Sequence, residues 1–204
     1  MTLQIDHDID NITADHRLSR IQFLRLSVWF TLGLCAAAAI LPLPFGRSGV
    51  WLALQPADLF TWRTLISGLG GLLVGEAIAL LINCWRPLYV VAKRLSSLVA
   101  WEDFRAQDYF TVALLAALGE ELLFRGAIQP LIGLIPTAVF FGLLHATSAA
   151  HVVLATLLGL GLGWLYSWSG NLWPPIVAHL AIDLVTGLVL KRNTRLRSPI
   201  ATGD

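Results

Sequence analysis

Three charged side chains, Glu120, Glu121 and Arg125, interrupt an apolar run from Tyr109 to Ile128 that is long enough to cross a membrane. A charge near the bilayer centre costs on the order of 2.5–3.5 kcal/mol, so these groups must pair, face a wet cavity or take part in chemistry. Glu121 and Arg125 lie four residues apart, on nearly one helical face, and we expect them to pair. Glu120 lies about 100° from Glu121 around the helix and remains a free carboxylate. The alternative is an ion network that only holds helices together.

Two further apolar segments carry polar groups at helical spacing. One contains Phe141 and His145, and the other contains His179 and Asp183, four residues apart, so that Asp183 can fix the tautomer of His179. A single histidine inside a membrane is more often a structural donor than a catalyst. Together with Glu120, however, these residues supply a base, an imidazole partner and donors for an oxyanion, which is what activation of water requires. The same residues, one Glu and two His, also form a plausible zinc-ligand set.

The composition is that of an integral membrane protein. Hydrophobic residues make up 56% of the 204 residues and charged residues only 13%, against about 25% in soluble domains. The net charge is +1, and no basic tract interleaved with aromatic residues indicates nucleic-acid binding. We therefore predict an all-α, polytopic membrane helix bundle of about six transmembrane helices with an amphipathic connector.

The hydrophobic pattern divides the chain into four regions: a polar arm (1–20), two spans and a connector (21–107), a core of four spans (108–190) and a basic tail (191–204). The predicted spans are Leu26–Phe45, Thr64–Trp85, Tyr109–Ile128 closed by Pro130, Leu131–Ala149, His151–Trp168 and Leu172–Leu190, with Arg86–Asp108 as the amphipathic connector. The glycines of the second span (Gly68, Gly70, Gly71, Gly75) and of the fifth (Gly159, Gly161, Gly163) predict close helix packing. The second span also holds Glu76, a fourth intramembrane acid.

Depth along the predicted helices gives a partial check on the site. Glu120 lies about 18 Å, and His179 about 16 Å, from the cytoplasmic end of its helix at 1.5 Å per residue. These depths agree, but His145 comes out shallower if its helix ends near Ala149. The sequence therefore predicts that this helix extends further, tilts or breaks.

The basic residues predict the orientation in the membrane. Of the 14 Lys and Arg residues, Arg47 and Arg63 lie in one loop and Arg125 within an apolar run. The other eleven lie in the arm, the connector and the tail. By the positive-inside rule, we expect a multi-pass protein of the cell membrane with both termini in the cytoplasm.

Three motifs together resemble those of the CPBP family, the intramembrane endopeptidases that include CAAX prenyl proteases and bacteriocin-processing, Abi-type proteins. They are Glu-Glu-x-x-x-Arg (Glu120, Glu121, Arg125), Phe-x-x-x-His (Phe141, His145) and His-x-x-x-Asp/Asn (His179, Asp183). Each motif alone is weak, but all three occur in order on separate apolar segments. The resemblance covers roughly Phe110 to Leu190.

The resemblance implies a helical membrane enzyme that cleaves peptide bonds with a glutamate-activated water. Glu120 would be the base, His145 would help to hold the water, and His179 with Asp183 would stabilise the oxyanion. Glu121, Arg125 and Phe141 would be supporting residues. Many members carry Asn at the last position, and an ionised Asp183 cannot donate a hydrogen bond, so Asp183 must be protonated or must orient His179.

Several alternatives stay open at this point. A zinc protease with ligands Glu120, His145 and His179 ranks below the metal-free enzyme, because Asp183 is the one second-shell partner visible in the sequence. A proton-coupled transporter could use Glu76 and Glu120, although no inverted repeat is visible. A non-catalytic scaffold or bacteriocin-immunity protein is the third alternative. The expected partners are the lipid bilayer and a peptide or protein substrate, lipidated or not, with no nucleic acid and no cofactor.

Overall fold

The computed structural model describes residues 17–47 and 54–192, and within these residues the protein is a bundle of helices without a sheet. The elements are α2 (Arg20–Ile40), η1 (Leu43–Phe45), η3 (Pro56–Phe60), α3 (Trp62–Cys84), α4 (Arg86–Ser97), η4 (Trp101–Asp103), α5 (Ala106–Glu121), the π-helical η5 (Leu122–Ile128), α6 (Gln129–Ile132), α7 (Leu134–Leu144), α8 (Ala149–Ser169) and α9 (Trp173–Arg192). The prediction of an all-α fold is confirmed. The arm up to residue 16, the tail beyond residue 192 and residues 48–53 lie outside the described residues.

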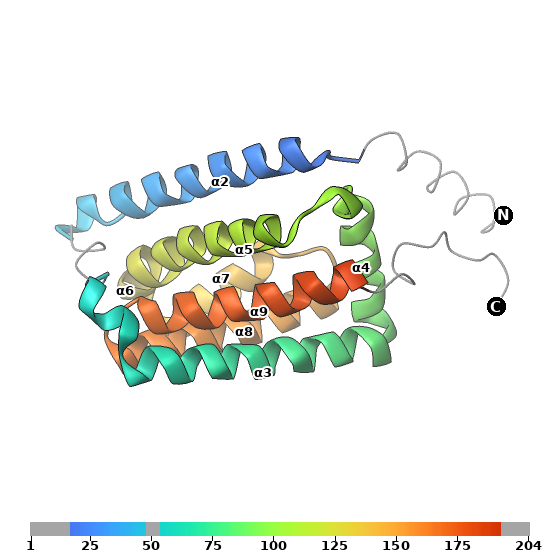
Figure 1. Ribbon diagram of the computed structural model, residues 1–204. Coiled ribbons are helices and arrows are strands. Elements are labelled where there is room, and N and C mark those ends of the chain that lie inside the picture. The colour runs from blue at the N-terminus through green and yellow to red at the C-terminus, as the bar shows by residue number, and fades with distance from the viewer. Residues whose placement is uncertain (1–16, 48–53, 193–204) are drawn as a thin grey trace, which may run out of the picture.

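The long helices run side by side (Figure 1), with α9 packed against both α3 and α5 and with α7 against α8. The helix α4 crosses one end of the bundle, where α2 begins and α9 ends. At Gly71 of α3, a β-carbon would collide with the backbone of Ala178 on α9, and at Gly159 of α8 it would lie 3.2 Å from Ala138 on α7. The predicted close packing is therefore confirmed at these two glycines, which bring the helix axes together.

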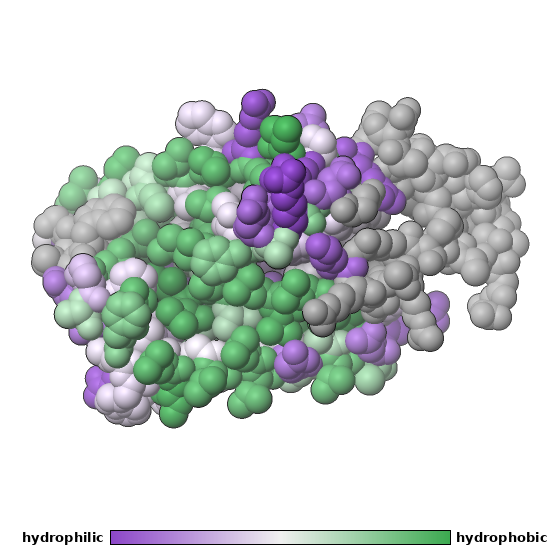
Figure 2. Space-filling model, viewed as in Figure 1, coloured by the Kyte–Doolittle hydropathy of each residue, from purple (hydrophilic) through white to green (hydrophobic). Residues whose placement is uncertain are grey.

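The outer surface of the bundle is that of a membrane protein. Three helical segments (Arg20–Phe45, Trp62–Cys84 and Ala149–Ser169) are long and apolar enough to cross a membrane, and two shorter ones (Leu134–Leu144 and Trp173–Val189) are apolar. Hydrophobic residues cover most of the visible middle of the bundle, and hydrophilic residues gather mainly towards the α4 end (Figure 2). Large side chains such as Leu73 (74% exposed) and Trp29 (72% exposed) point outwards, as expected for contact with lipid tails.

Two predicted boundaries in the core are wrong. Pro130 does not close the third span, because it occupies the first turn of α6, where its missing N–H is tolerated, and the helical path continues to Ile132. The chain then turns at Gly133, whose φ of 89° is readily adopted by glycine. The fourth segment is helical only over Leu134–Leu144, so at about 1.5 Å per residue it reaches only part of the way through a bilayer.

The connector forms the helix α4, and part of its apolar face packs against the bundle. Leu88 and Ala92 pack with Ile78 and Ile82 of α3 and Ile182 of α9. Arg86 and Arg94 are exposed, whereas Ser96 is buried. Hence α4 covers the end of the bundle and packs against α3, the second span, and α9, which carries part of the candidate site.

Candidate active site

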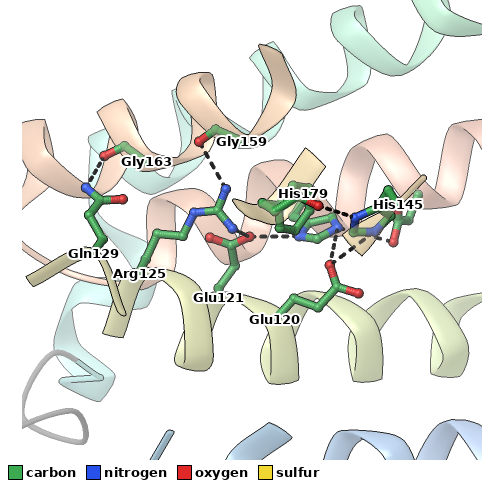
Figure 3. Close-up of polar contacts among 10 residues, drawn as sticks. Glu120, Glu121, Arg125, Gln129, His145, Gly159, Gly163 and His179 are labelled. Atoms are coloured by element: carbon green, nitrogen blue, oxygen red, sulfur yellow. Dashed lines mark hydrogen bonds and ion pairs between the residues drawn. The ribbon is translucent and has the colours of Figure 1, made fainter. Parts of the chain in front are cut away.

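The candidate residues come from three elements that meet in the middle of the bundle (Figure 3). Glu120 and Glu121 are the last two residues of α5, His145 is the C-cap residue of α7, and His179 and Asp183 lie on α9. The structure therefore brings together the four residues predicted to be catalytic, which are far apart in the sequence.

Glu121 and Arg125 form the predicted ion pair, which is confirmed. Arg125 Nη1 donates to Glu121 Oε1 over 3.0 Å, and both side chains are fully buried. Arg125 Nη2 also donates to the carbonyl of Gly159 on α8 over 3.1 Å. The pair therefore ties the α5–η5 segment to α8, and its desolvation is offset by direct hydrogen bonds.

The tautomer of His179 is held by Glu121 and not, as predicted, by Asp183. His179 Nδ1 lies 2.8 Å from Glu121 Oε1, whereas Asp183 Oδ2 lies 3.6 Å from His179 Nε2, beyond hydrogen-bond distance. The sequence analysis missed this contact because it joins residues 58 positions apart. The Glu121 carboxylate thus contacts both the Arg125 guanidinium and the His179 imidazole.

His145 owes its position to the early end of α7. Its Nδ1 lies 2.8 Å from the carbonyl oxygen of Phe141, and its ring lies 4.4 Å from the Phe141 ring. Since a carbonyl can only accept, Nδ1 carries the proton and Nε2 is left as an acceptor. Depth can instead be measured from the turn at Gly133, where α6 ends and α7 begins. On that measure His145 lies about 16 Å from Leu134 and Glu120 about 18 Å from Ile132, so the two residues lie at similar depths.

Glu120 has no direct hydrogen-bond partner among the described residues. Its Oε2 lies 4.0 Å from His145 Nε2 and 3.9 Å from His179 Nε2. The side chains are partly accessible, with 15% of Glu120, 31% of His145 and 33% of Asp183 exposed. Glu120 Oε2 therefore lies near the Nε2 atoms of both histidines without a direct hydrogen bond to either.

The structure adds features that the sequence analysis missed. The segment η5 is π-helical, with the Gln129 N–H donating to Phe124 O, and such turns are frequent at functional sites. Gln129 extends the buried network by donating to Gly163 O over 2.9 Å. The change from α-helical to π-helical spacing after Glu121 leaves no clear periodic signal in the sequence. Gln129 looks in the sequence like an ordinary polar residue at the end of a span.

His151 is a further neighbour that the sequence analysis did not single out. Its Nδ1 lies 2.8 Å from Thr147 Oγ1, and its ring lies 5.8 Å from that of His145. It therefore belongs to the rim of the site at the start of α8. The HxxxxxH spacing from His145 to His151 was the available signal.

The residues fit a zinc ion in part. The Nδ1 atom of His145 contacts a carbonyl and that of His179 a carboxylate, as is usual for zinc-bound histidines, and this removes the reason for ranking zinc lower. However, tetrahedral ligands about 2.0–2.1 Å from zinc would lie roughly 3.3 Å apart. The observed 3.9 and 4.0 Å are longer, and the described residues contain no ready-made cluster of three metal-ligating side chains.

Glu76 is not part of this site. It is exposed on α3, a helix that packs against α9 on the side of Gly71 and Gly75. A proton relay that runs from Glu76 to Glu120 therefore has no continuous path of polar contacts among the described residues.

The fold and the site together define a helical membrane protein with a glutamate and two histidines gathered between its helices. Residues 103–185 match the family model described as "Type II CAAX prenyl endopeptidase Rce1-like", and this region contains every candidate catalytic residue. The resemblance to the CPBP family is therefore confirmed over this region. The family that this model describes is one of CAAX prenyl endopeptidases.

A curated relative is similar to part of the chain. The "Uncharacterized protein YpbD" of Bacillus subtilis (strain 168) is 39% identical over 77 residues, a match that covers 36% of this chain and 41% of the relative. The chain thus matches less than half of the length of that relative. No solved structure matches the chain.

Proposed function

We propose that the protein is an intramembrane endopeptidase in which Glu120 activates a water molecule for attack on a peptide bond. The observation that carries the proposal is the convergence of Glu120 Oε2 with His145 Nε2 and His179 Nε2 at 4.0 and 3.9 Å. Polar atoms at this separation are too far apart to bond directly but suit a bridging water about 2.8 Å from each.

The donors and acceptors of each side chain suggest its role in the proposed reaction. His145 Nε2 accepts a hydrogen bond from one O–H of the water and Glu120 Oε2 from the other, and Glu120 then takes the proton as the water oxygen attacks. His179 has carboxylate oxygens near both ring nitrogens, at 2.8 Å from Nδ1 and 3.6 Å from Nε2. This arrangement suits an imidazolium that donates from Nε2 to the developing oxyanion.

The reaction then balances without a further reagent. The water oxygen bonds to the carbonyl carbon, its proton passes to Glu120, and the oxyanion accepts a hydrogen bond from His179. When the C–N bond breaks, Glu120 returns the proton to the leaving amine. Asp183 acts as the second anion beside His179 and, when protonated, as a donor at the open edge of the site.

A zinc-dependent mechanism is the second candidate, favoured by the engaged Nδ1 atoms of both histidines. In that case Glu120, His145 and His179 would hold the ion, which would supply a Lewis acid and activate its bound water. The metal content of the purified protein, measured by mass spectrometry before and after 1,10-phenanthroline, separates the candidates. Stoichiometric zinc, with activity lost on chelation and restored by zinc, would replace the metal-free mechanism.

The substrate class follows from the membrane location of the site: a membrane-associated protein or peptide, of the CAAX type or one processed at its C-terminus or propeptide. The test is to compare the C-termini of membrane proteins in cells that carry the wild type or Glu120→Gln. New C-termini that depend on Glu120 support the protease. Identical sets, with both proteins present at equal levels, would instead favour a scaffold or immunity protein.

The orientation is part of the same proposal: both termini are cytoplasmic, as the distribution of Lys and Arg predicts. Ala57→Cys and Asp103→Cys place exposed thiols at opposite ends of the bundle, in a background that lacks Cys35 and Cys84. An impermeant maleimide on intact cells should label Ala57→Cys and spare Asp103→Cys. The reverse pattern would invert the orientation.

A further inference from the structure

A long apolar groove of about 570 Å³ lies between α3 and α8, away from the candidate catalytic site. One wall is a stripe of α3 residues spaced four apart: Trp62, Ile66, Gly70 and Val74. The opposite wall is a stripe on α8: Leu157, Gly161, Leu165 and Trp168. Ala178 and Ile182 of α9 form the floor. The groove thus follows about half of α3, from Trp62 to Val74, and is lined almost entirely by apolar side chains.

Two glycines create the hollow. A β-carbon at Gly70 or at Gly161 would meet nothing within 4 Å, in contrast to Gly71 and Gly159, which pack against neighbouring helices. The predicted close packing is therefore wrong for Gly70 and Gly161. These two glycines leave room for an occupant that is not part of the described chain.

The length of the groove matches one leaflet of a bilayer. From Trp62 to Val74, α3 rises about 18 Å at 1.5 Å per residue, and half of a hydrocarbon core of about 30 Å is roughly 15 Å. One acyl chain of a lipid in that leaflet therefore runs from the mouth to the end of the groove.

A cation marks the mouth of the groove. The Arg63 guanidinium lies 5.7 Å from the Trp62 ring centre and 5.2 Å from that of Trp168, and Trp164 stacks on Trp168 at 5.8 Å. Tryptophan and arginine at this position are typical of the lipid headgroup region. Among the described residues Arg63 forms no ion pair with a carboxylate, and its hydrogen bond to Ser169 O is long at 3.5 Å. Its charge is therefore available to an anion.

We propose that the groove binds one phospholipid, with an acyl chain between α3 and α8 and the phosphate on Arg63. The pairing of an apolar channel with a cation at one end fits a molecule that is apolar along its length and anionic at its head. A transmembrane helix, about 10–12 Å across with its side chains, offers no such anion at a fixed end. The site is separate from the proposed chemistry, because α9 stands between the groove and Glu120.

The test uses the purified full-length protein in detergent, titrated with phosphatidylglycerol and followed by native mass spectrometry. The wild type should retain one phosphatidylglycerol and bind dioleoylglycerol, which lacks the phosphate, at least about tenfold more weakly. Gly161→Leu, which fills the groove and favours the helix, should abolish retention. Arg63→Gln should weaken it by about tenfold or more without altering the groove.

Two variants serve as matched controls. Gly33→Leu adds the same side chain on α2, where a β-carbon also meets nothing within 4 Å, and Arg47→Gln removes another cation at the same end of the bundle. Both should retain the lipid as the wild type does. Equal retention by Gly161→Leu and Gly33→Leu would overturn the proposal. A change from dimer to monomer in Gly161→Leu, with no lipid bound to the wild type, would assign the groove to a second copy of the chain instead.

Discussion

Two polar clusters adjoin one another at the end of α5, and they are built in opposite ways. The cluster of Glu121, Arg125 and Gln129 is buried: Arg125 donates to Glu121, and both Arg125 and Gln129 donate to the backbone of α8, all over 2.9–3.1 Å. The cluster of Glu120, His145, His179 and Asp183 is partly exposed, and the contacts Glu120–His145, Glu120–His179 and His179–Asp183 are longer, at 3.6–4.0 Å. Glu120 and Glu121 are neighbours in sequence but belong to different clusters.

The difference separates support from chemistry. A buried charge is tolerated when its partners are fixed, so the first cluster is closed and holds three helices in register. Catalytic groups must instead leave space for water and substrate and hold their positions through other residues. His179 joins the two clusters, because Glu121 holds its Nδ1 while its Nε2 faces Glu120.

The largest effect should come from Glu120→Gln. Loss of the general base should lower cleavage of a validated substrate by about 10³-fold, while the melting temperature in detergent stays within error of the wild type, because Glu120 makes no direct hydrogen bond. Activity and thermal unfolding are measured on the same preparation. Full cleavage by this variant would show that Glu120 is not the base and that the two clusters do not differ in function.

Substitutions of Asp183 test a second member of the cluster that contains Glu120. Asp183→Leu should reduce turnover by about 10²-fold, the usual cost of one oxyanion donor, whereas Asp183→Asn should be close to the wild type because an amide donates without needing a proton. The ratio of the two rates is the measurement. Wild-type turnover of Asp183→Leu would exclude the residue from the site and would remove one of the three motifs.

The same change at the neighbouring position should have the opposite outcome. Glu121→Gln removes the charge that pairs with Arg125 but keeps an acceptor, so it should lower the free energy of unfolding by about 1–3 kcal/mol and leave part of the activity. Glu120→Gln is the matched control, because it makes an identical chemical change one residue away. Equal melting temperatures for the two variants would contradict the division into a supporting and a reactive cluster.

The sequence predicted the fold class, the ion pair of Glu121 with Arg125 and the gathering of Glu120, His145 and His179. These follow from local rules: the length of apolar runs, helical spacing and the cost of a charge in lipid. What it missed depends on contacts between distant residues or on departures from regular helices. Glu121 holds His179 across 58 positions, and η5 changes the helical spacing directly after the glutamates.

The half-length helix α7 shows the same limit in physical terms. Its residues are as apolar as those of a full span, so composition predicted a helix over Leu131–Ala149. Only the observed break at His145, next to Glu120 and capped by its own contact with Phe141 O, shows why the segment stops. In the sequence, the shallower predicted depth of His145 relative to Glu120 and His179 correctly indicated this break.

A second ion pair, Arg20 with Asp108, extends the comparison to the end of the bundle and should show the smallest effect. Arg20 Nε and Nη2 donate to the two Asp108 oxygens over 2.6 and 2.7 Å, and the Arg105 N–H donates to Oδ2 over 2.7 Å. Asp108 precedes the apolar run, and the Arg20 side chain is 26% exposed, so solvent screens this pair more than the buried one. Asp108→Asn should therefore cost only about 1 kcal/mol of stability.

The pH dependence identifies this pair. The hydrogen bonds from Arg20 lower the pKa of Asp108 from 3.8 to about 2. Because the pKa is lower in the folded protein, the pair contributes its full stability above about pH 4, and that contribution is lost as the pH falls towards 2. Melting temperatures between pH 2 and pH 5 should fall more steeply for the wild type than for Asp108→Asn, and the control Asp103→Asn, at an exposed position, should follow the wild type. Parallel curves for all three proteins would show that the α2–α5 contact does not depend on this charge, which would leave Arg125–Glu121 as the ion pair on which the packing of the bundle depends.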